Sequence, residues 1–416
     1  MTNTGGIKMK GFWNKLGHKY LQKMQIGTLE VQYPDSSTII YGNNQTPYVK
    51  VRIHSSQFFR RLAFYGDIGF AESYMDGDFD TDDLTELIKL SLLNSQYLGI
   101  KSEDYQENRF SNLMPNMNRI KHLLRKNSKT RSKKNISEHY DLSNDFFKLM
   151  LDDTMMYSSA IFASNEEDLY EAQKRKIEHL ANKLRIKPGA KVLEIGSGWG
   201  AVAVHLAKDL GCEVTTVTLS AEQKNFCHDK FKLEDVEDKI DILLQDYRDL
   251  EGTYDAIISI EMFEAVGAEY FDIFFKKCES LLKPSGVLAM QVITIPDQRY
   301  DAYSKSTDFI QKYIFPGGHL PSVSKVLNVT THHTRLNLIH MEEFAEDYAK
   351  TLRVWDENFS AKLDEVKGLG FDDYFIRMWK MYLNYCEAAF ITRNIGLVQL
   401  VFSRDQNIDL NKGLVA

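Results

Sequence analysis

The sequence predicts a doubly wound α/β domain with inserted helices, preceded by a smaller mixed α+β domain. From residue 137 onward, short apolar runs alternate with helical segments, the order of a parallel sheet built from strand–helix units. These runs do not alternate with polar residues, as expected for strands buried on both faces of a sheet. A basic segment, residues 119–134, separates the two patterns and holds eight lysines and arginines and no acid. We therefore predict domains at residues 1–118 and 137–404, a basic linker at 119–136 and a C-terminal tail at 405–416.

Each element of the second domain follows from its apolar pattern. Strands are predicted at residues 191–196, 213–219, 240–246, 254–260, 286–294 and 397–404, the last at the sheet edge. Helices are predicted at residues 201–210 and 270–282. Residues 301–314 and 344–385 are mainly helical in pattern, and helices inserted late in such a fold commonly cover an active site.

The N-terminal domain shows both periodicities. Residues 28–33 and 48–53 alternate as strands do. Leu84, Leu87, Ile88 and Leu92 share one helical face, and Asp83 with Glu86 resembles a capping box at its start. We expect this domain to contact lipid or a partner.

Two basic stretches each leave two interpretations open. Trp13, Leu16, Tyr20 and Met24 form one helical stripe beside Lys15, Lys19 and Lys23. Such a helix lies in a membrane interface or packs on its own domain. The basic segment is a solvated linker or a contact for anionic lipid, where each basic residue contributes about 1 kcal/mol.

Composition narrows the class of protein. The 416 residues carry 51 lysines and arginines against 58 acidic residues, so the net charge of −7 argues against a general nucleic-acid binder. The four cysteines lie far apart, which favours reduced cytoplasmic thiols. No apolar run reaches 18 residues and the N-terminus lacks a signal peptide, so we expect no transmembrane helix. His332 and His333 lack a third ligand at suitable spacing, and we predict no metal.

A glycine-rich turn marks a candidate cofactor site. The predicted strand KVLEIG leads into Gly196, Gly198 and Gly200, where glycines let the backbone turn tightly beside a helix N-terminus. Glu194 precedes this turn and Asp246 ends the third predicted strand. The arrangement resembles the S-adenosylmethionine site of class I methyltransferases. Acidic groups suit a cofactor that carries an ammonium and a sulfonium.

Eight blocks in this order resemble the cyclopropane-fatty-acyl-phospholipid synthase family, which includes bacterial lipid enzymes and mycolic acid cyclopropane synthases. The blocks are HYDLSNDFF (139–147), MYSSAIF (156–162), VLEIGSGWG (192–200), TLSAEQ (218–223), MFEAVG (262–267), IFPGGHLPS (314–322), DYAKTLRVW (347–355) and YLNYCEAAF (382–390). The resemblance covers residues 137–404 and implies a Rossmann-like class I methyltransferase domain. It also implies that the cofactor is held by Tyr140, Tyr157, Ser158, Glu194, Gly196, Gly198, Thr218, Leu219, Gln223, Asp246 and Tyr247.

The resemblance further implies a reaction. The enzyme adds a methylene group from S-adenosylmethionine to the double bond of an unsaturated phospholipid acyl chain, through a carbocation. In the family the base is a bound bicarbonate or carbonate ion, and the matching positions here are Glu264, Tyr348 and the backbone of Ile293. Two positions depart from the family pattern, because Ser159 stands where cysteine is expected and Gln291 where histidine is expected.

Several alternatives remain open at this stage. Plant-type members of the family resemble this chain in having glutamine at the position of Gln291. The departure therefore leaves open the product and the rate of the reaction more than membership of the family. The product is a cyclopropane, or a methyl or methylene branch; the other options are N-methylation of a small amine and a non-catalytic binding protein. Cys386 matches a position sometimes assigned to the active site, and packing or support of the site is its other interpretation. We expect a cytoplasmic protein, peripheral at the inner face of the membrane, and the sequence leaves a homo-oligomer open.

Overall fold

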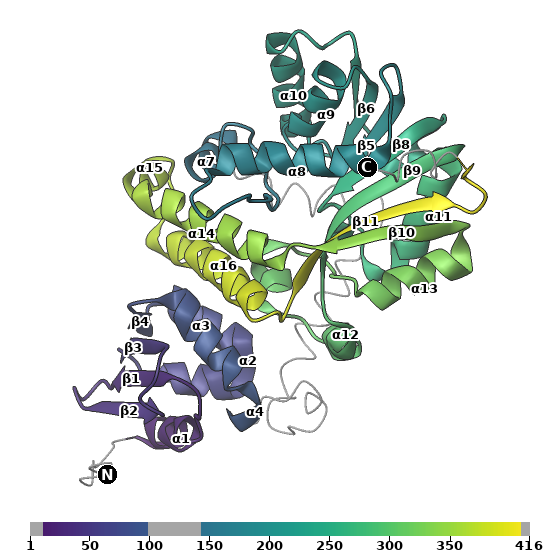
Figure 1. Ribbon diagram of the computed structural model, residues 1–416. Coiled ribbons are helices and arrows are strands. Elements are labelled where there is room, and N and C mark those ends of the chain that lie inside the picture. Colours follow the sequence, from purple (N-terminus) through teal and green to yellow (C-terminus); the bar gives the residue numbers. More distant parts are fainter. Residues whose placement is uncertain (1–10, 99–142, 409–416) are drawn as a thin grey trace. The chain divides into compact units, whose positions relative to one another are not determined.

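The computed structural model describes residues 11–98 and 143–408, and the chain divides into two compact units (Figure 1). The first unit comprises residues 1–122, 301–314 and 363–394, and the second comprises residues 123–300, 315–362 and 395–416. The basic segment and Tyr140 lie outside the described residues. The domain boundaries therefore stay a prediction, although two segments of the predicted second domain belong to the first unit.

The first unit is built on a four-stranded mixed sheet. Its strands are β1 (Thr28–Gln32), β2 (Thr38–Gly42), β3 (Tyr48–Ile53) and β4 (Phe79–Thr81), in the order β2-β1-β3-β4. Its helices are α1 (Phe12–Leu21), α2 (Gln57–Met75), α3 (Leu84–Leu93), α4 (Ser95–Leu98), α15 (Leu363–Gly368) and α16 (Asp373–Ile391), with a π-helical turn at Ile310–Ile314. The predicted cap is confirmed, since the Asp83 side chain accepts a hydrogen bond from the Glu86 N–H at 2.8 Å.

Helix α1 packs on its own unit. Trp13, Tyr20 and Met24 contact the apolar core of the small sheet, which supports the packing interpretation of the stripe. Phe12 and Leu16 remain 70% and 41% exposed, so a short apolar patch still faces outward.

Helix α16 belongs to the first unit although the sequence pattern assigned it to the later domain. The Thr85 hydroxyl bonds to Asn384 Oδ1 at 2.9 Å and to Glu387 Oε2 at 2.8 Å. Arg377 donates to Asp80 Oδ1 at 2.9 Å and to the Phe79 carbonyl at 2.8 Å. The Thr85 contacts are buried, where unpaired polar groups would cost free energy, whereas the Arg377–Asp80 pair is exposed.

The second unit contains a seven-stranded sheet in the order β10-β11-β9-β8-β5-β6-β7. Its strands are β5 (Lys191–Ile195), β6 (Glu213–Thr218), β7 (Ile240–Leu244), β8 (Tyr254–Ile260), β9 (Leu282–Thr294), β10 (Leu336–Glu343) and β11 (Gly396–Arg404). The first five in chain order are parallel. Strand β11 pairs antiparallel with β9, and β10 pairs antiparallel with β11, so the edge strand is β10 and the predicted edge position of residues 397–404 is wrong. The doubly wound α/β fold and the smaller mixed domain are both confirmed.

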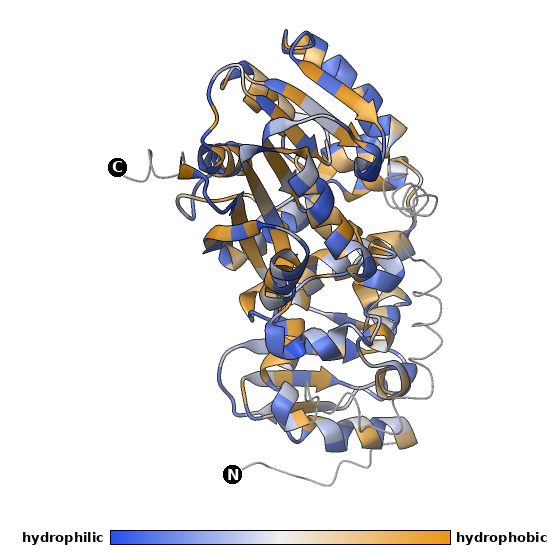
Figure 2. Cartoon of the chain, turned by 90° about the vertical axis from the view of Figure 1, so that its right-hand side faces the viewer, coloured by the Kyte–Doolittle hydropathy of each residue, from blue (hydrophilic) through white to orange (hydrophobic). Residues whose placement is uncertain are grey.

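Helices cover both faces of this sheet. They are α7 (Asn144–Met150), α8 (Leu169–Leu184), α9 (Ala201–Lys208), α10 (Ala221–Leu233), α11 (Phe271–Leu281), α13 (Val323–His333) and α14 (Ala345–Ala361). Alternate strand residues enter two different cores: Val192 and Ala256 face α8 and α9, whereas Leu193 and Ile257 face α11. In Figure 2 hydrophobic colouring follows these strands, while the helices alternate in colour along their length. Burial on both faces explains why the strand sequences do not alternate.

The order of the strands positions a site. The chain winds from β5 outward to β7, then returns to β8 on the other side of β5. Ligands of such sheets bind at the carboxyl ends of the strands where the winding reverses, which is here between β5 and β8. Within the described residues, no helix has the length and hydropathy needed to cross a membrane.

Asn94 offers a direct test of the first unit. Its buried side chain accepts from the Gln25 N–H at 2.8 Å and the Ile26 N–H at 3.0 Å, and donates to the Ile26 carbonyl at 2.9 Å. Asn94→Ala leaves these backbone groups unpaired and should destabilise the unit by about 2–4 kcal/mol. Hydrogen exchange at Gln25 and Ile26 should accelerate at least ~10-fold, and the exposed control Asn43→Ala should not change it. Unchanged exchange in Asn94→Ala would contradict this role.

Candidate active site

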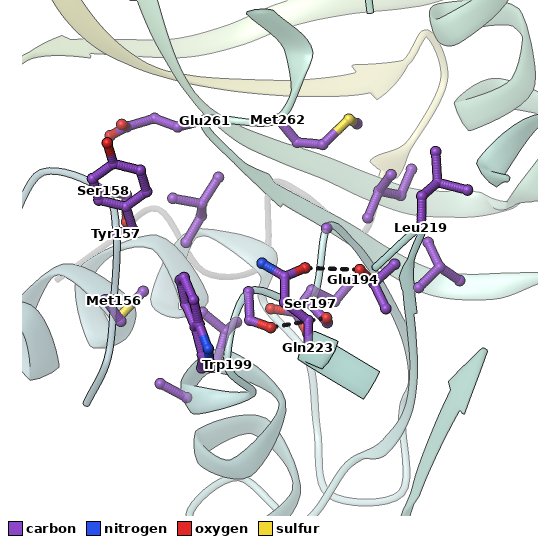
Figure 3. Close-up of a pocket in the computed structure, with 18 of the residues that line it drawn as sticks. Met156, Tyr157, Ser158, Glu194, Ser197, Trp199, Leu219, Gln223, Glu261 and Met262 are labelled. Atoms are coloured by element: carbon purple, nitrogen blue, oxygen red, sulfur yellow. Dashed lines mark hydrogen bonds between the residues drawn. The ribbon is translucent and has the colours of Figure 1, made fainter. Parts of the chain in front are cut away.

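An open pocket lies at the carboxyl ends of β5, β6 and β8 (Figure 3). It encloses about 1020 Å³, including space continuous with solvent, which suits a ligand of nucleoside size. Of the residues predicted to bind the cofactor, those that line it are Tyr157, Ser158, Glu194, Gly196, Gly198, Thr218, Leu219, Gln223 and Tyr247. Asp246 lies beside this set, and its carboxylate is paired with the Arg248 guanidinium at 2.6 Å.

The glycine turn forms the floor of the pocket. Gly196 and Gly198 have φ angles of 100° and 48°, a region that glycine adopts readily. A Cβ placed on Gly198 would meet no atom within 4 Å, so its backbone borders open space. Gly200, the N-cap of α9, is packed instead, because a Cβ there would lie 2.8 Å from the Phe231 ring. The turn therefore offers a ligand a backbone surface at Gly198.

Glu194 supplies an unusual carboxyl group to this pocket. It is 4% exposed, and its Oε2 accepts a hydrogen bond from the Thr216 hydroxyl at 2.5 Å. Burial raises the pKa of Glu194 to about 8, against the smaller opposing effect of Thr216. A cationic ligand would favour the ionised form. These residues fit a cofactor that carries positive charge.

The cofactor-site residues on β6 and α10 hold each other in place. The Thr218 hydroxyl donates to Gln223 Oε1 at 2.8 Å, and Ser220 caps α10 by accepting from the Gln223 N–H. This leaves the amide nitrogen of Gln223 at the pocket wall.

A second cluster gathers around a residue that the sequence reasoning missed, Glu261. This residue follows β8 directly and lines the same pocket. Its Oε1 accepts from the Ser159 N–H at 2.9 Å and from Gln291 Nε2 at 2.8 Å. Its Oε2 accepts from the Tyr348 hydroxyl at 2.6 Å. Three of the residues predicted to hold a bicarbonate or carbonate ion therefore hold the Glu261 carboxylate.

That arrangement does not fit a free anion. The Ser159 hydroxyl turns away from the cluster and donates to the Ala160 carbonyl at 3.0 Å. The Gln291 amide nitrogen is already shared between Glu261 and the Ser159 carbonyl, at 2.8 and 3.2 Å. A bicarbonate ion would have to displace the carboxylate to reach the same donors.

A chain of hydrogen bonds fixes the orientation of Gln291. Lys183 Nζ, which can only donate, bonds to Gln399 Oε1 at 2.8 Å. Gln399 Nε2 then donates to Gln291 Oε1 at 3.0 Å, and both glutamines are fully buried. In each glutamine the amide oxygen therefore accepts a hydrogen bond and the amide nitrogen donates to the next group. The group to which Gln291 Nε2 donates is Glu261. Lys183 and Gln399 are positioning residues.

Glu264 plays a separate part in this region. Its Oε1 accepts from the Ile293 N–H at 2.5 Å, so two residues that were expected to hold the anion bond to each other. Its Oε2 is buried and has no hydrogen-bond partner among the described residues. Burial, followed by the nearby charge of Glu261, raises the pKa of Glu264 to about 8. Near neutral pH Glu264 is therefore mostly the neutral acid.

Lys176 is the second residue that the sequence reasoning missed. It is fully buried on α8, and its Nζ donates to the Ser158 hydroxyl oxygen at 2.6 Å. Burial lowers the pKa of Lys176 to about 7, while Glu261 and Asp152 favour its charged form. A lysine in line with Ala172 and Leu180 on an apolar helical face was the signal that could have found it.

Aromatic rings cluster around Tyr157, which lines the pocket, whereas Phe147 and Trp355 are fully buried. The Tyr157 ring lies 5.2 Å from that of Phe147 and 5.3 Å from that of Trp355. The Trp355 ring also contacts Tyr348, with ring centres 6.2 Å apart. Aromatic faces of this kind attract positive charge.

Cys386, His332 and His333 are not among the residues that line the pocket. Cys386 lies on α16 in the first unit, and burial raises the pKa of its thiol, which disfavours a nucleophilic thiolate. Within the ranges that the structure describes, no group of three or more histidine, cysteine or acidic side chains could hold a metal ion.

The pKa of Glu194 predicts how stability changes with pH. The folded protein binds a proton at Glu194 more tightly than the unfolded chain, so this group lowers stability as pH rises from about 4.5 to about 8. The unfolding temperature of Glu194→Gln, without cofactor, should fall less between pH 5.5 and 8 than that of the wild type. The exposed variant Glu237→Gln is the control and should follow the wild type. Equal slopes for Glu194→Gln and the wild type would show that Glu194 is ionised in the free protein.

Known proteins similar to this chain include methyltransferases and cyclopropane synthases. The family described as mycolic acid cyclopropane synthetase matches residues 127–400, and a domain of unknown function (DUF7884) matches residues 16–99. Tuberculostearic acid methyltransferase UfaA1 of Mycobacterium tuberculosis is 36% identical over 353 residues, which cover 83% of this chain and 81% of that protein. Cyclopropane-fatty-acyl-phospholipid synthase of Escherichia coli (strain K12) is 37% identical over 361 residues, which cover 85% and 87%.

A solved structure of the same family also matches. The mycolic acid cyclopropane synthase CmaA1 complexed with SAH and CTAB is 31% identical and has a TM-score of 0.61, covering 65% of this chain and 98% of that chain. This chain therefore belongs to the mycolic acid cyclopropane synthetase family and is an S-adenosylmethionine-dependent methyltransferase similar to the cyclopropane-fatty-acyl-phospholipid synthases.

Proposed function

We propose that this enzyme converts the double bond of an unsaturated phospholipid acyl chain into a cyclopropane ring. The observation that carries the proposal is Glu261, a hydrogen-bonded carboxylate on the wall of the predicted cofactor pocket. Simple transfer to an amine needs no such buried proton acceptor, whereas ring closure on a carbocation does. S-adenosylmethionine, when bound, supplies an electrophilic methyl group.

The chain's own residues support this chemistry in two ways. The ring of Tyr157, which lines the pocket and packs against Trp355, stabilises positive charge on the acyl chain. The pocket turn at Gly198 and the carboxyl of Glu194 hold the cofactor, with Thr218 and Gln223 on the nucleoside side.

A methyl or methylene branch is the second candidate. The similarity to tuberculostearic acid methyltransferase UfaA1, at 36% identity, favours it as strongly as the similarity to the Escherichia coli synthase favours a ring. Both products start from the same carbocation. Loss of a proton from the added methyl closes the ring, whereas a hydride shift from the methylated carbon to the cationic carbon, followed by proton loss from the added methyl, gives a methylene branch that a separate reductant would convert to a methyl branch. The plant coclaurine N-methyltransferase is only 22% identical, so its likeness supports the fold and not its reaction.

We also propose that the enzyme works at the cytoplasmic face of a membrane, where its substrate lies. Phe12 and Leu16 on α1 form an exposed apolar pair beside the exposed lysines Lys15 and Lys19. Together with the basic segment, they suit an anionic lipid surface.

The function can be tested directly. Purified protein is incubated with methyl-labelled S-adenosylmethionine and vesicles of an unsaturated phospholipid, and the fatty acids are analysed by mass spectrometry. The proposal predicts a gain of one CH2 with loss of the alkene. A gain of one CH2 with an alkene retained would establish a methylene branch, and a gain of CH4 without an alkene would establish a methyl branch after reduction. Labelled amines without labelled lipid would refute action on acyl chains.

Gly198 tests the cofactor site itself. Gly198→Ala puts a methyl group into the pocket, and we expect at least ~10-fold weaker binding of S-adenosylhomocysteine by calorimetry. Gly189→Ala is the matched control, because Gly189 also has a positive φ, of 81°, and no atom near its Cβ position, yet it does not line the pocket. Backbone strain costs about 1 kcal/mol in both variants. Equal binding by the two variants would remove Gly198 from the cofactor site.

A further inference from the structure

We propose that the Glu261 carboxylate is the catalytic base and replaces the free bicarbonate or carbonate ion that the family resemblance implies. This inference rests on the proposed function, since it names the group that collects the proton in that reaction. It concerns a residue that lies outside the set of base-site positions taken from the family.

The first argument is the match between donors and acceptor. A carboxylate and a bicarbonate ion are both planar, with two oxygens that share a negative charge. The Ser159 N–H, Gln291 Nε2 and the Tyr348 hydroxyl form three hydrogen bonds to Glu261, between 2.6 and 2.9 Å. Oε1 accepts two of them and Oε2 accepts one, so Oε2 keeps a lone pair for a proton.

The second argument is the backbone at Glu261. Its φ angle of 50° lies in the left-handed region, which is unfavourable for a residue with a side chain by about 1 kcal/mol. The Glu261 N–H donates to the Gln291 carbonyl at 2.8 Å and holds this conformation. In Figure 3 the Glu261 side chain extends toward Tyr157 and Ser158 on the pocket wall. The strained conformation thus directs the carboxylate into the pocket.

The third argument is charge. Lys176 lies on the opposite side of Ser158 and favours an ionised Glu261, whereas Glu264 is kept mostly neutral. Burial raises the pKa of Glu261, and the Tyr348 hydroxyl and Lys176 oppose that rise. A carboxylate that is charged yet poorly solvated is a stronger base than one in water.

The departure at Gln291 then has an explanation, whereas Ser159 contributes only its backbone N–H, which any residue would offer. A carboxylate that is part of the chain needs only hydrogen-bond donors to hold it, and a neutral glutamine serves as well as a cationic histidine. Gln291 is held in the donating orientation by Gln399 and Lys183.

The proposed step transfers one methyl carbon to the alkene and one proton to Glu261. The alkene π electrons form a bond to the transferred methyl carbon as its bond to sulfur breaks and leaves its electron pair on sulfur, and the other alkene carbon becomes a cation. Glu261 Oε2 takes a proton from the added carbon, and the released C–H electron pair closes the three-membered ring. Glu261 is then a neutral acid, and it loses this proton to solvent before the next turnover.

Two variants and a control test the proposal. Glu261→Gln keeps the shape and removes the base, whereas Glu261→Gly removes the side chain and leaves the three donors free. Glu237→Gln is an exposed control. Each protein is assayed for lipid methylation in carbon-dioxide-depleted buffer with and without added bicarbonate, for S-adenosylhomocysteine binding by calorimetry, and for 13C-bicarbonate binding by NMR without lipid.

We expect wild-type turnover to change less than ~2-fold with bicarbonate. Glu261→Gln should lose at least ~100-fold in turnover, bind S-adenosylhomocysteine within ~2-fold of the wild type and gain nothing from bicarbonate. Glu261→Gly should bind 13C-bicarbonate, which the wild type should not, and regain at least ~10-fold of its lost turnover when bicarbonate is added.

Several results would overturn the proposal: a wild type that requires bicarbonate, a wild type that binds 13C-bicarbonate at this site, or a Glu261→Gln variant with near-normal turnover. If the wild type modifies no lipid, the proposed function fails. The 13C-bicarbonate measurement still decides whether Glu261 occupies the anion site, because it needs neither lipid nor turnover.

Discussion

The site depends on holding a carboxylate, Glu261, in a network of hydrogen bonds at the wall of the pocket. Such a group is costly to bury unless donors and opposite charge compensate it. The three donors come from a loop, a central strand and a helix, and they meet only when the sheet and its covering helices are complete. Folding and the assembly of the proton-accepting group are therefore the same event.

Supporting residues extend this constraint well beyond the pocket. Lys183 orients two buried glutamines in sequence, so a charge on the far side of α8 determines which atom Gln291 presents to Glu261. On the other side, Lys176 and Ser158 balance the negative charge. Glu194 and Glu264 lie nearby as mostly neutral acids, which limits repulsion until a cationic ligand arrives. The arrangement gives neighbouring carboxyl groups different protonation states, and so different roles.

Much of this was predictable from sequence. The parallel strands follow from apolar runs, since burial on both faces removes alternation, and the glycine turn predicted the floor of the pocket. Glu264 and Ile293, both expected to contact an anion, instead bond to each other. Glu261 was missed because its donors are separated from it by as many as 102 residues along the chain, so no local pattern marks it. Helix α16 groups with the first compact unit although the family match extends through it, because its partners in α2 and α3 are distant in sequence. The expected bicarbonate ion came from resemblance alone, whereas the proposal that Glu261 takes its place rests on hydrogen bonds that no sequence pattern reveals.

The most direct test of this account is a crystal structure of the enzyme with S-adenosylhomocysteine, grown in bicarbonate buffer. The account predicts the Glu261 carboxylate between the Ser159 N–H, Gln291 and Tyr348, with no separate planar anion at these donors. A carbonate ion bound to the three donors, with Glu261 turned away from them, would contradict it.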